Sequence, residues 1–239
     1  MIKKLINQNT NYKLKLLDSM ECEYIFNNEP INRLNNKNDL QEKLPNNKDE
    51  QIRELKDEIN SIENCKLKEN AKNIILGDGN VNSLVMIIGG APSTQDDLSG
   101  KTFSGDDGVL LEKMLMAINI KKKEIYFSYA VNFQPPLDRK PTTEEIRRYS
   151  GFLQKHISII HPKLIILMGS TAMEALVGIN SKISNERGIW KEMIIKNTNY
   201  KIIITFDPSY LLRMPENKKY SWQDLKKIKN KINELNLKI

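Results

Sequence analysis

The chain has few of the residues on which several classes of protein depend. Its 239 residues include two cysteines, Cys22 and Cys65, too few for a disulfide framework or for a site built from four thiolates. No apolar run reaches the roughly 18 residues of a membrane span, and the first residues contain no apolar core typical of a secretion signal. We therefore expect a cytoplasmic protein without a membrane partner.

Two common nucleotide-binding signatures are also missing. The segment GGAPSTQDDLSGKTFSGDDG (89–108) is rich in glycine, but it lacks the Lys-Ser/Thr of a P-loop and the GxGxxG of a dinucleotide fold. Taken by itself it is typical of an ordinary turn. Its possible acid or base groups are Asp96, Asp97, Asp106 and Asp107.

The composition that is present describes a globular protein with a basic surface. Hydrophobic residues make up 39% of the chain and charged residues 28%, and 37 Lys and Arg against 30 Asp and Glu give a net charge of +7. This excess favours a polyanionic partner such as nucleic acid. A chain crowded with Lys, Asn and Ile is equally typical of an AT-rich genome, so the charge leaves both interpretations open.

The composition changes along the chain. Residues 27–48 are rich in asparagine and include two prolines, which indicates a solvated linker. Apolar residues then recur every three or four positions and predict a helix that packs on the domain after it: Ile52, Leu55, Ile59 and Ile62. We expect an N-terminal extension over residues 1–48 and one domain over 49–239.

From residue 84 the pattern becomes that of an α/β fold. Apolar segments rich in β-forming residues alternate with helical patterns at 84–90, 125–131, 164–169 and 201–206. Thr142 and Glu145 form a capping box at the start of one intervening helix. The sequence predicts a three-layer αβα domain with a central four-stranded, mostly parallel sheet, in addition to the N-terminal helical and linker extension.

Ligands of such sheets bind outside the carboxyl ends of the strands, so the segments after these strands are the places to look for chemistry. The second strand leads into VNFQPPLDRKPTTEEI, where prolines stiffen an exposed loop that carries Arg139 and Lys140. The fourth leads into TFDPSYLLRMPE, a turn fixed by proline with a serine, two leucines and Arg213. The basic loop suits phosphate contacts.

Together these segments resemble the uracil-DNA glycosylase superfamily, in particular its family 4 branch and the alphaproteobacterial relatives of that branch. GGAPS…DD…GKTF-SG is similar to the family's GEAPG…ED…GxPFVG, and YFSYAVNFQPPLDRKPTTEE to YITNxxxxRPPxNRxPTxxE. IIHPKLIILMGSTAMEALVG matches the next strand-helix pair, and DPSYLLRMPENK is similar to HPxYLLRxPxxK. The four motifs keep their order and spacing over about residues 50–235.

The resemblance implies that the protein removes uracil from DNA after the base has been flipped into a pocket. It implies that Phe103 stacks on the base, core packing being the alternative for this ring, and that Leu211 or Leu212 fills the space left in the duplex. The residues it places around the base are Gly89, Gly90, Ala91, Phe103 and Tyr129. The residues it places on DNA are Pro92, Ser93, Arg139, Pro208, Ser209, Leu211, Leu212 and Arg213.

The chain departs from the family at three positions that carry chemistry. Gly90 replaces a glutamate, Tyr129 replaces the asparagine that binds uracil, and Asp207 replaces a histidine. A sister branch with FxGDxSG uses the aspartate for catalysis, and Phe103 to Asp106 fit that spacing. We expect Asp106 and Asp207 to be the catalytic candidates, with a first-turn helix carboxylate as the alternative for Asp106.

A fourth departure concerns a cofactor. Family 4 enzymes hold a four-iron cluster with four cysteines, and here the register gives Ile62, Cys65, Phe133 and Tyr149 at those positions. Because one thiolate is too few to hold a cluster, we expect no cofactor, and we expect the other three side chains to fill its volume.

Three functions remain open at this stage. The leading hypothesis is a monomeric, cofactor-free glycosylase with DNA as its partner, acting in base-excision repair with weak or altered activity. The alternatives are a catalytically silent DNA-binding module and an enzyme for another deaminated base such as hypoxanthine. The replacements at Gly90, Tyr129 and Asp207 favour silence, whereas the retained Phe103 and Arg213 favour continued use of DNA.

Overall fold

The computed structural model describes residues 48–178 and 181–237. The asparagine-rich linker expected up to residue 48 lies outside the described residues, except for Lys48, with which the first described helix begins. Among the described residues, none of the helices is both long and apolar enough to cross a membrane.

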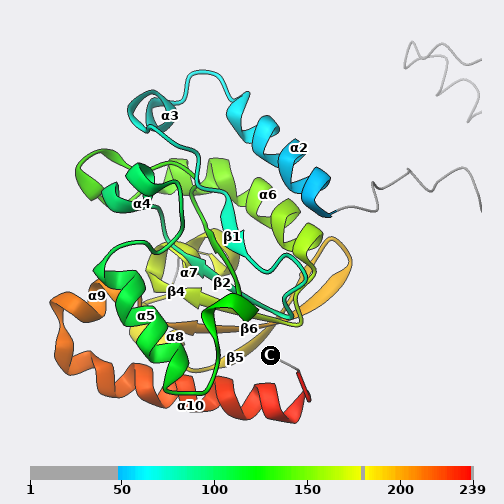
Figure 1. The fold of residues 1–239 in the computed structure, drawn as a ribbon, viewed down its shortest axis with the longest axis vertical. Coiled ribbons are helices and arrows are strands. Elements are labelled where there is room, and N and C mark those ends of the chain that lie inside the picture. Colours follow the sequence, from blue (N-terminus) through cyan, green and yellow to red (C-terminus); the bar gives the residue numbers. More distant parts are fainter. Residues whose placement is uncertain (1–47, 179–180, 238–239) are drawn as a thin grey trace, which may run out of the picture. The chain divides into compact units, whose positions relative to one another are not determined.

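A six-stranded sheet forms the centre of the described part (Figure 1). The strand order is β1-β3-β2-β4-β6-β5, and β3, β2, β4 and β6 run parallel while β1 and β5 pair antiparallel at the two edges. The strands are β1 (Gly77–Gly79), β2 (Val85–Gly89), β3 (Tyr126–Tyr129), β4 (Leu164–Met168), β5 (Trp190–Ile195) and β6 (Thr198–Thr205).

The α/β class and the mostly parallel sheet are confirmed, but the predicted number of four strands was wrong. The two edge strands are those that carry little hydrophobic signal. β1 is three residues long and two of them are glycine, a weak strand former. β5 is largely half-buried or exposed and carries the charged pair Lys191 and Glu192, which is common on edges because charge discourages pairing with another chain.

Helices cover both faces of the sheet (Figure 1). On one face lie α2 (Lys48–Asn60), α6 (Thr143–Ile160) and α7 (Gly169–Val177), and on the other α5 (Asp106–Met116) and α10 (Lys218–Glu234). The shorter helices are α3 (Lys66–Asn70), α4 (Thr94–Ser99), α8 (Ile183–Glu186) and α9 (Pro208–Arg213), with 3₁₀ turns η1 (Lys122–Glu124), η2 (Pro136–Asp138) and η3 (Pro215–Asn217).

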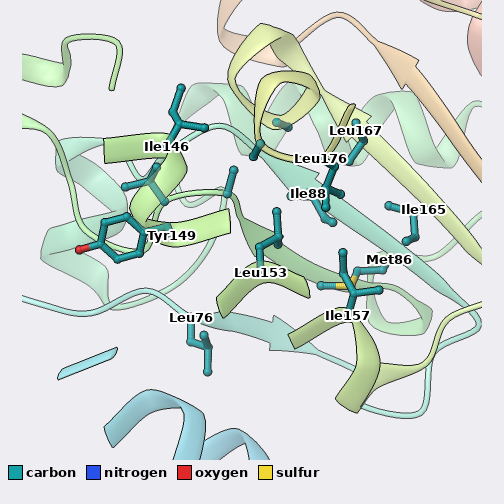
Figure 2. Close-up of a cluster of buried hydrophobic side chains, with 14 of the residues drawn as sticks. Leu76, Met86, Ile88, Ile146, Tyr149, Leu153, Ile157, Ile165, Leu167 and Leu176 are labelled. Atoms are coloured by element: carbon teal, nitrogen blue, oxygen red, sulfur yellow. The ribbon is translucent and has the colours of Figure 1, made fainter. Parts of the chain in front are cut away.

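The core under α6 shows why these helices pack where they do (Figure 2). Residues spaced three or four apart on α6, such as Leu153 and Ile157, meet alternate residues of β2, such as Met86 and Ile88. The predicted capping box is present, since Thr142 and Glu145 each accept a hydrogen bond from the other's backbone N–H. The predicted docking of α2 is confirmed as well, because its apolar stripe belongs to this cluster.

The strand order creates a place for a ligand. The chain leaves β2 towards β3 on one side and leaves β4 towards β6 on the other. Adjacent parallel strands whose connections diverge in this way leave a crevice outside their carboxyl ends.

Candidate functional site

A cleft of about 1260 Å³ opens at this crevice. All four segments that follow the parallel strands line it, together with the start of α5. The segments expected to carry the chemistry therefore meet at one cleft. Among the predicted site residues, the following line it: Gly90, Ala91, Pro92, Ser93, Phe103, Asp106, Tyr129, Arg139, Asp207, Ser209, Leu212 and Arg213.

Three predicted residues are not among those that line the cleft. Gly89 ends β2 behind two aromatic rings, and Pro208 is buried in the first turn of α9. Leu211 is 0% exposed and packs into the core under α5 and α10. Since a buried side chain is unavailable to enter a DNA duplex, the choice left open between the two leucines falls on Leu212, which is 42% exposed.

Aromatic side chains form one wall of the cleft. The ring of Phe103 is 2% exposed and lies 5.0 Å from the ring of Tyr129 and 5.9 Å from that of Phe127, measured between centroids. Both cleft-lining rings press on Gly89, where a Cβ atom would stand 2.7 Å from Tyr129 and 2.8 Å from Phe103. The ring predicted to stack on a base therefore packs in the buried core, which was the alternative for it, and reaches the cleft with little of its surface.

The backbone around Phe103 is unusual in a way that fixes this ring. Phe103 has a φ of 47°, in the left-handed region that non-glycine residues seldom adopt. Its carbonyl oxygen points at Gly108 in the first turn of α5, where a Cβ atom would lie 1.7 Å away. Glycine at 108 is therefore required for α5 to begin directly beside the ring.

A buried carboxylate ties three segments of the cleft together. Asp96 is fully buried and accepts hydrogen bonds from the N–H and hydroxyl of Ser93, at 2.8 Å each, and from those of Ser104, at 2.7 and 2.8 Å. The hydroxyl of Tyr129 donates to it at 2.9 Å and accepts from the N–H of Phe103 at 3.0 Å. Asp96, one of the possible acid or base groups of the sequence, thus has a structural role.

Tyr129 consequently offers its hydroxyl to the protein and not to a ligand. Burial, reinforced by the charge of Asp96, raises the pKa of this phenol well above its usual value, so it stays a neutral donor. At the position where an asparagine would read uracil, this chain places a ring whose polar atom is already fully engaged.

Four carboxylates line the cleft, Asp106, Asp107, Asp138 and Asp207, and they differ in burial and in their hydrogen bonds. Asp106 is exposed at the start of α5. Asp107 is half-buried beside it, and its Oδ1 accepts a hydrogen bond of 2.8 Å from the N–H of Gly108. Burial, with the negative charges of Asp96 and Asp207, raises the pKa of Asp107 to about 6.

Asp207 caps the helix that follows it. Its Oδ1 accepts from the N–H of Ser209 at 2.8 Å and from the hydroxyl of Ser209 at 2.6 Å. Burial raises the pKa of Asp207 although these bonds and the charge of Arg213 oppose it. Because α5 and α9 lie side by side, Asp107 and Asp207 influence each other across the cleft (Figure 1).

Gly90 leaves no ready space for the glutamate that the family has at this position. A Cβ atom there would lie 3.0 Å from the Cβ of Thr171, so a larger side chain would require Thr171 to shift. Asp106 and Asp107, at the start of α5, are the carboxylates that the cleft has nearest to Phe103 in the sequence.

The basic residues at the rim differ in how free their charges are. Arg139 forms a two-pronged ion pair with Glu145, at 2.6 and 2.8 Å. Arg187 pairs with Asp224, and its guanidinium lies over the rings of Phe206 and Tyr220. For Arg213, neither an ion pair nor a side-chain hydrogen bond is formed with any residue in the described ranges.

The four positions that hold an iron–sulfur cluster in family 4 do not fit one here. Cys65 lies 3.2 Å from the hydroxyl of Tyr149, and the rings of Tyr149 and Phe133 pack edge to face at 6.2 Å. Ile62 packs against the same cluster of apolar side chains. One sulfur beside a phenol hydroxyl and apolar side chains lacks the further thiolates that iron requires, and the described residues contain no group of three potential metal ligands.

The fold and this cleft define an α/β protein with a cleft at the carboxyl edge of a mostly parallel sheet. Comparison with known proteins agrees with the motifs: the model of the uracil DNA glycosylase superfamily matches residues 76–227. The chain belongs to this superfamily.

Several type-4 uracil-DNA glycosylases are similar to most of the chain, and three of them serve as examples. The protein from Thermotoga maritima is 33% identical over 169 residues, 70% of this chain and 86% of the relative. Those from Archaeoglobus fulgidus and Sulfurisphaera tokodaii are 28% identical over 183 residues and 31% over 185, covering 75% and 74% of this chain and 92% and 83% of the relatives.

Sequence reasoning named Asp107 only as one of four possible acid or base groups and did not single out Leu137, which is exposed in η2. The doublet Asp106-Asp107 before Gly108 placed two carboxylates in the first turn of one predicted helix, but the sequence did not show which of them is buried. For Leu137 the signal was an apolar residue inside a loop stiffened by prolines.

Proposed function

We propose that the protein is a uracil-DNA glycosylase of base-excision repair, which hydrolyses the N-glycosidic bond of a uracil flipped out of DNA into the cleft. Membership of the superfamily and the names of the type-4 relatives support this assignment. The observation that carries it is the single cleft on which Phe103, the α5 carboxylates and the Ser209 to Arg213 segment converge.

Hydrolysis of the N-glycosidic bond requires that the departing uracil carry away an electron pair and that a water molecule be positioned and deprotonated. As the bond between C1′ and the base breaks, its electron pair leaves with uracil, and water adds to C1′ and loses a proton. Of the two carboxylates at the start of α5, we assign the positioning of this water and the acceptance of its proton to Asp107. It is half-buried within the cleft, whereas Asp106 is exposed at its edge.

Other residues bind the substrate. We assign stacking on the base to Phe103, with the backbone of Gly90 and Ala91 beside it, and phosphate contacts to Ser93, Ser209 and Arg213. Arg139 contributes less charge because Glu145 neutralises it. Leu212 enters the gap that the flipped base leaves.

The organisation that we propose around this site is simple. Residues 49–239 form the glycosylase domain, 1–48 an extension, and the enzyme works as a cytoplasmic monomer without a cofactor, on DNA. The mismatch of the four cluster positions with iron supports the absence of a cluster.

A second candidate substrate is another deaminated base such as hypoxanthine. The observation that favours it is Tyr129, whose hydroxyl is engaged by Asp96 and Phe103 and whose ring lines the cleft. A pocket without the asparagine amide loses a group that reads uracil, so its preference among bases is open to change.

An excision assay tests both candidates. Oligonucleotides that contain one uracil, one hypoxanthine or neither are incubated with the protein, and abasic sites are then cleaved with alkali. We expect product from the uracil strand, reduced about 10²-fold or more by Asp107→Asn and far less by Asp106→Asn. DNA binding without product from either lesion would identify a silent binding module and contradict the proposal.

A further inference from the structure

The loop after β3 holds an apolar side chain away from the protein. Leu137, in the 3₁₀ turn η2, is 98% exposed. Single exposed leucines are common on protein surfaces and need no explanation by themselves. The backbone beneath this one sets it apart.

Two consecutive residues of this turn adopt the left-handed conformation. Leu137 has a φ of 57° and Asp138 a φ of 52°. Glycine and asparagine occupy this region at lower cost than leucine, whose branched side chain crowds the backbone there. A fully exposed leucine gains no burial in return, so in the free protein the residue carries a cost without a visible benefit.

The rest of the loop holds the strained turn in place. The Oδ1 of Asp138 accepts from the N–H of Thr94 at 2.9 Å and from the amide of Gln134 at 2.8 Å, while its Oδ2 accepts from the hydroxyl of Thr94 at 2.9 Å. Pro135 and Pro136 restrict the chain immediately before Leu137. The side chain is therefore presented on a rigid support that is bonded to the start of α4.

The position of the loop relates Leu137 to the cleft. Its neighbours Pro135, Asp138 and Arg139 line the cleft, whereas Leu137 itself lies at the rim and faces solvent. The other exposed leucine at the rim, Leu212, follows β6. Because β2 and β4 lie between β3 and β6, the two leucines stem from loops about three strand spacings apart, on the order of 14 Å.

We propose that Leu137 inserts into the base stack of duplex DNA beside the flipped nucleotide, as a second wedge on the side of the cleft opposite to Leu212. This inference rests on the proposed function, because it presumes that a nucleotide of DNA enters the cleft. Apolar wedges unstack a base step and bend the duplex, and a rigid support lets them do so without first being ordered.

The test compares duplex with single-stranded DNA, because a wedge acts on stacked bases. Leu137→Asn removes the apolar side chain and suits the left-handed backbone, so the variant should unfold at the same temperature as the wild type or a higher one. We expect the kcat/KM of this variant for uracil in duplex DNA to fall about 10-fold or more. Its kcat/KM for uracil in single-stranded DNA should change by less than about 2-fold. Met116→Asn, at an exposed apolar position outside the cleft, is the matched control.

The inference would be overturned if the ratio of kcat/KM on duplex DNA to kcat/KM on single-stranded DNA were the same for Leu137→Asn as for the wild type. Binding of a duplex that carries the fluorescent base 2-aminopurine next to a non-cleavable uracil analogue gives a second measurement. We expect the wild type to increase the fluorescence by unstacking this base and Leu137→Asn to do so much less. If the wild type excises nothing, the proposed function fails and the fluorescence alone decides: equal signals from both proteins overturn the wedge.

Discussion

At the scale of single residues, the polar atoms around the cleft differ in whether they already form hydrogen bonds within the protein. The hydroxyl of Tyr129 and both oxygens of Asp96 are engaged within the protein. Asp107 keeps one oxygen without a hydrogen-bond partner among the described residues, since only its Oδ1 accepts the N–H of Gly108. A carboxylate in this state is available to a substrate or to water.

Asp107 should therefore control the pH dependence of the reaction. Its pKa of about 6 means that the ionised form is lost as the pH falls through 6, so kcat/KM for uracil release should decline below that pH. The measurement is a pH profile of the wild type and of Asp106→Asn, which should share this acid limb. A profile that stays flat from pH 7 to about 5 would argue against Asp107 as the base.

The same residue should cost the protein stability at neutral pH. Because folding raises the pKa of Asp107, its contribution to stability is full below the unfolded value of 3.8 and is lost as the pH rises through about 6. Asp107→Asn should therefore raise the free energy of unfolding at pH 7.5 by about 1 kcal/mol, after allowance for screening by water. Denaturant titrations should show this gain shrinking as the pH falls towards 4.

Most of the site residues predicted from the sequence line the cleft, but their hydrogen bonds could not be predicted. The motifs pointed to Phe103, Ser209 and Arg213 because each motif is contiguous in the chain. The bond from Tyr129 to Asp96 joins residues 33 positions apart, and no local pattern records it. For the same reason Asp106 was preferred to Asp107: burial and the approach of Asp207 depend on how α5 packs on α9.

At the scale of elements, the junction between Phe103 and α5 sets the geometry of the cleft. The helix starts where it does because Gly108 admits the carbonyl of Phe103, and its first turn then delivers Asp106 and Asp107 to the cleft. The ring and the carboxylates thus come from one short segment and move together.

Gly108→Ala should therefore disturb both stability and function. The new methyl group would stand 1.7 Å from the carbonyl oxygen of Phe103, and overpacking of this kind typically costs about 1–3 kcal/mol. Gly151→Ala is the matched control, since Gly151 lies in the middle of α6 with nothing within 4 Å, and it should stabilise the protein by about 0.5–1 kcal/mol. Thermal unfolding of both variants checks this prediction. An unfolding temperature of Gly108→Ala equal to that of the wild type would show that the junction accommodates a methyl group without cost.

Elements with a strong local signal could be predicted, and those without one could not. The buried strands β2 and β4 are nearly continuous apolar runs, and β6 contains three consecutive isoleucines. The helix α6 is indicated by the capping box at Thr142 and Glu145. The edge strands escaped because pairing with a neighbour, and not their own composition, makes them strands.

At the scale of the whole molecule, the net charge of +7 and the free guanidinium of Arg213 at the rim predict binding governed by phosphates. DNA affinity should fall steeply with salt, and Arg213→Ala should reduce the slope of log K against log salt by about 1. Arg53→Ala, an equal loss of charge at an exposed position of α2 that does not line the cleft, should leave the slope nearly unchanged. Fluorescence anisotropy over a salt series checks this, and equal slopes for both variants would contradict it.

The overall architecture was the most predictable level. Alternating strands and helices determine a parallel sheet, and a parallel sheet determines the edge at which loops meet. The sequence therefore located the site before it could describe its interior.

The hydrogen bonds to Asp96 carry one more consequence. A single carboxylate joins the start of α4, the Ser104 turn and the end of β3, so that these three walls are ordered when the chain folds and not when a ligand arrives. This half of the cleft should therefore be preorganised before a ligand binds. The amide protons of Ser93 and Ser104 should exchange with solvent as slowly as those of the central strands. Any induced fit is then left to α9 and the opposite rim.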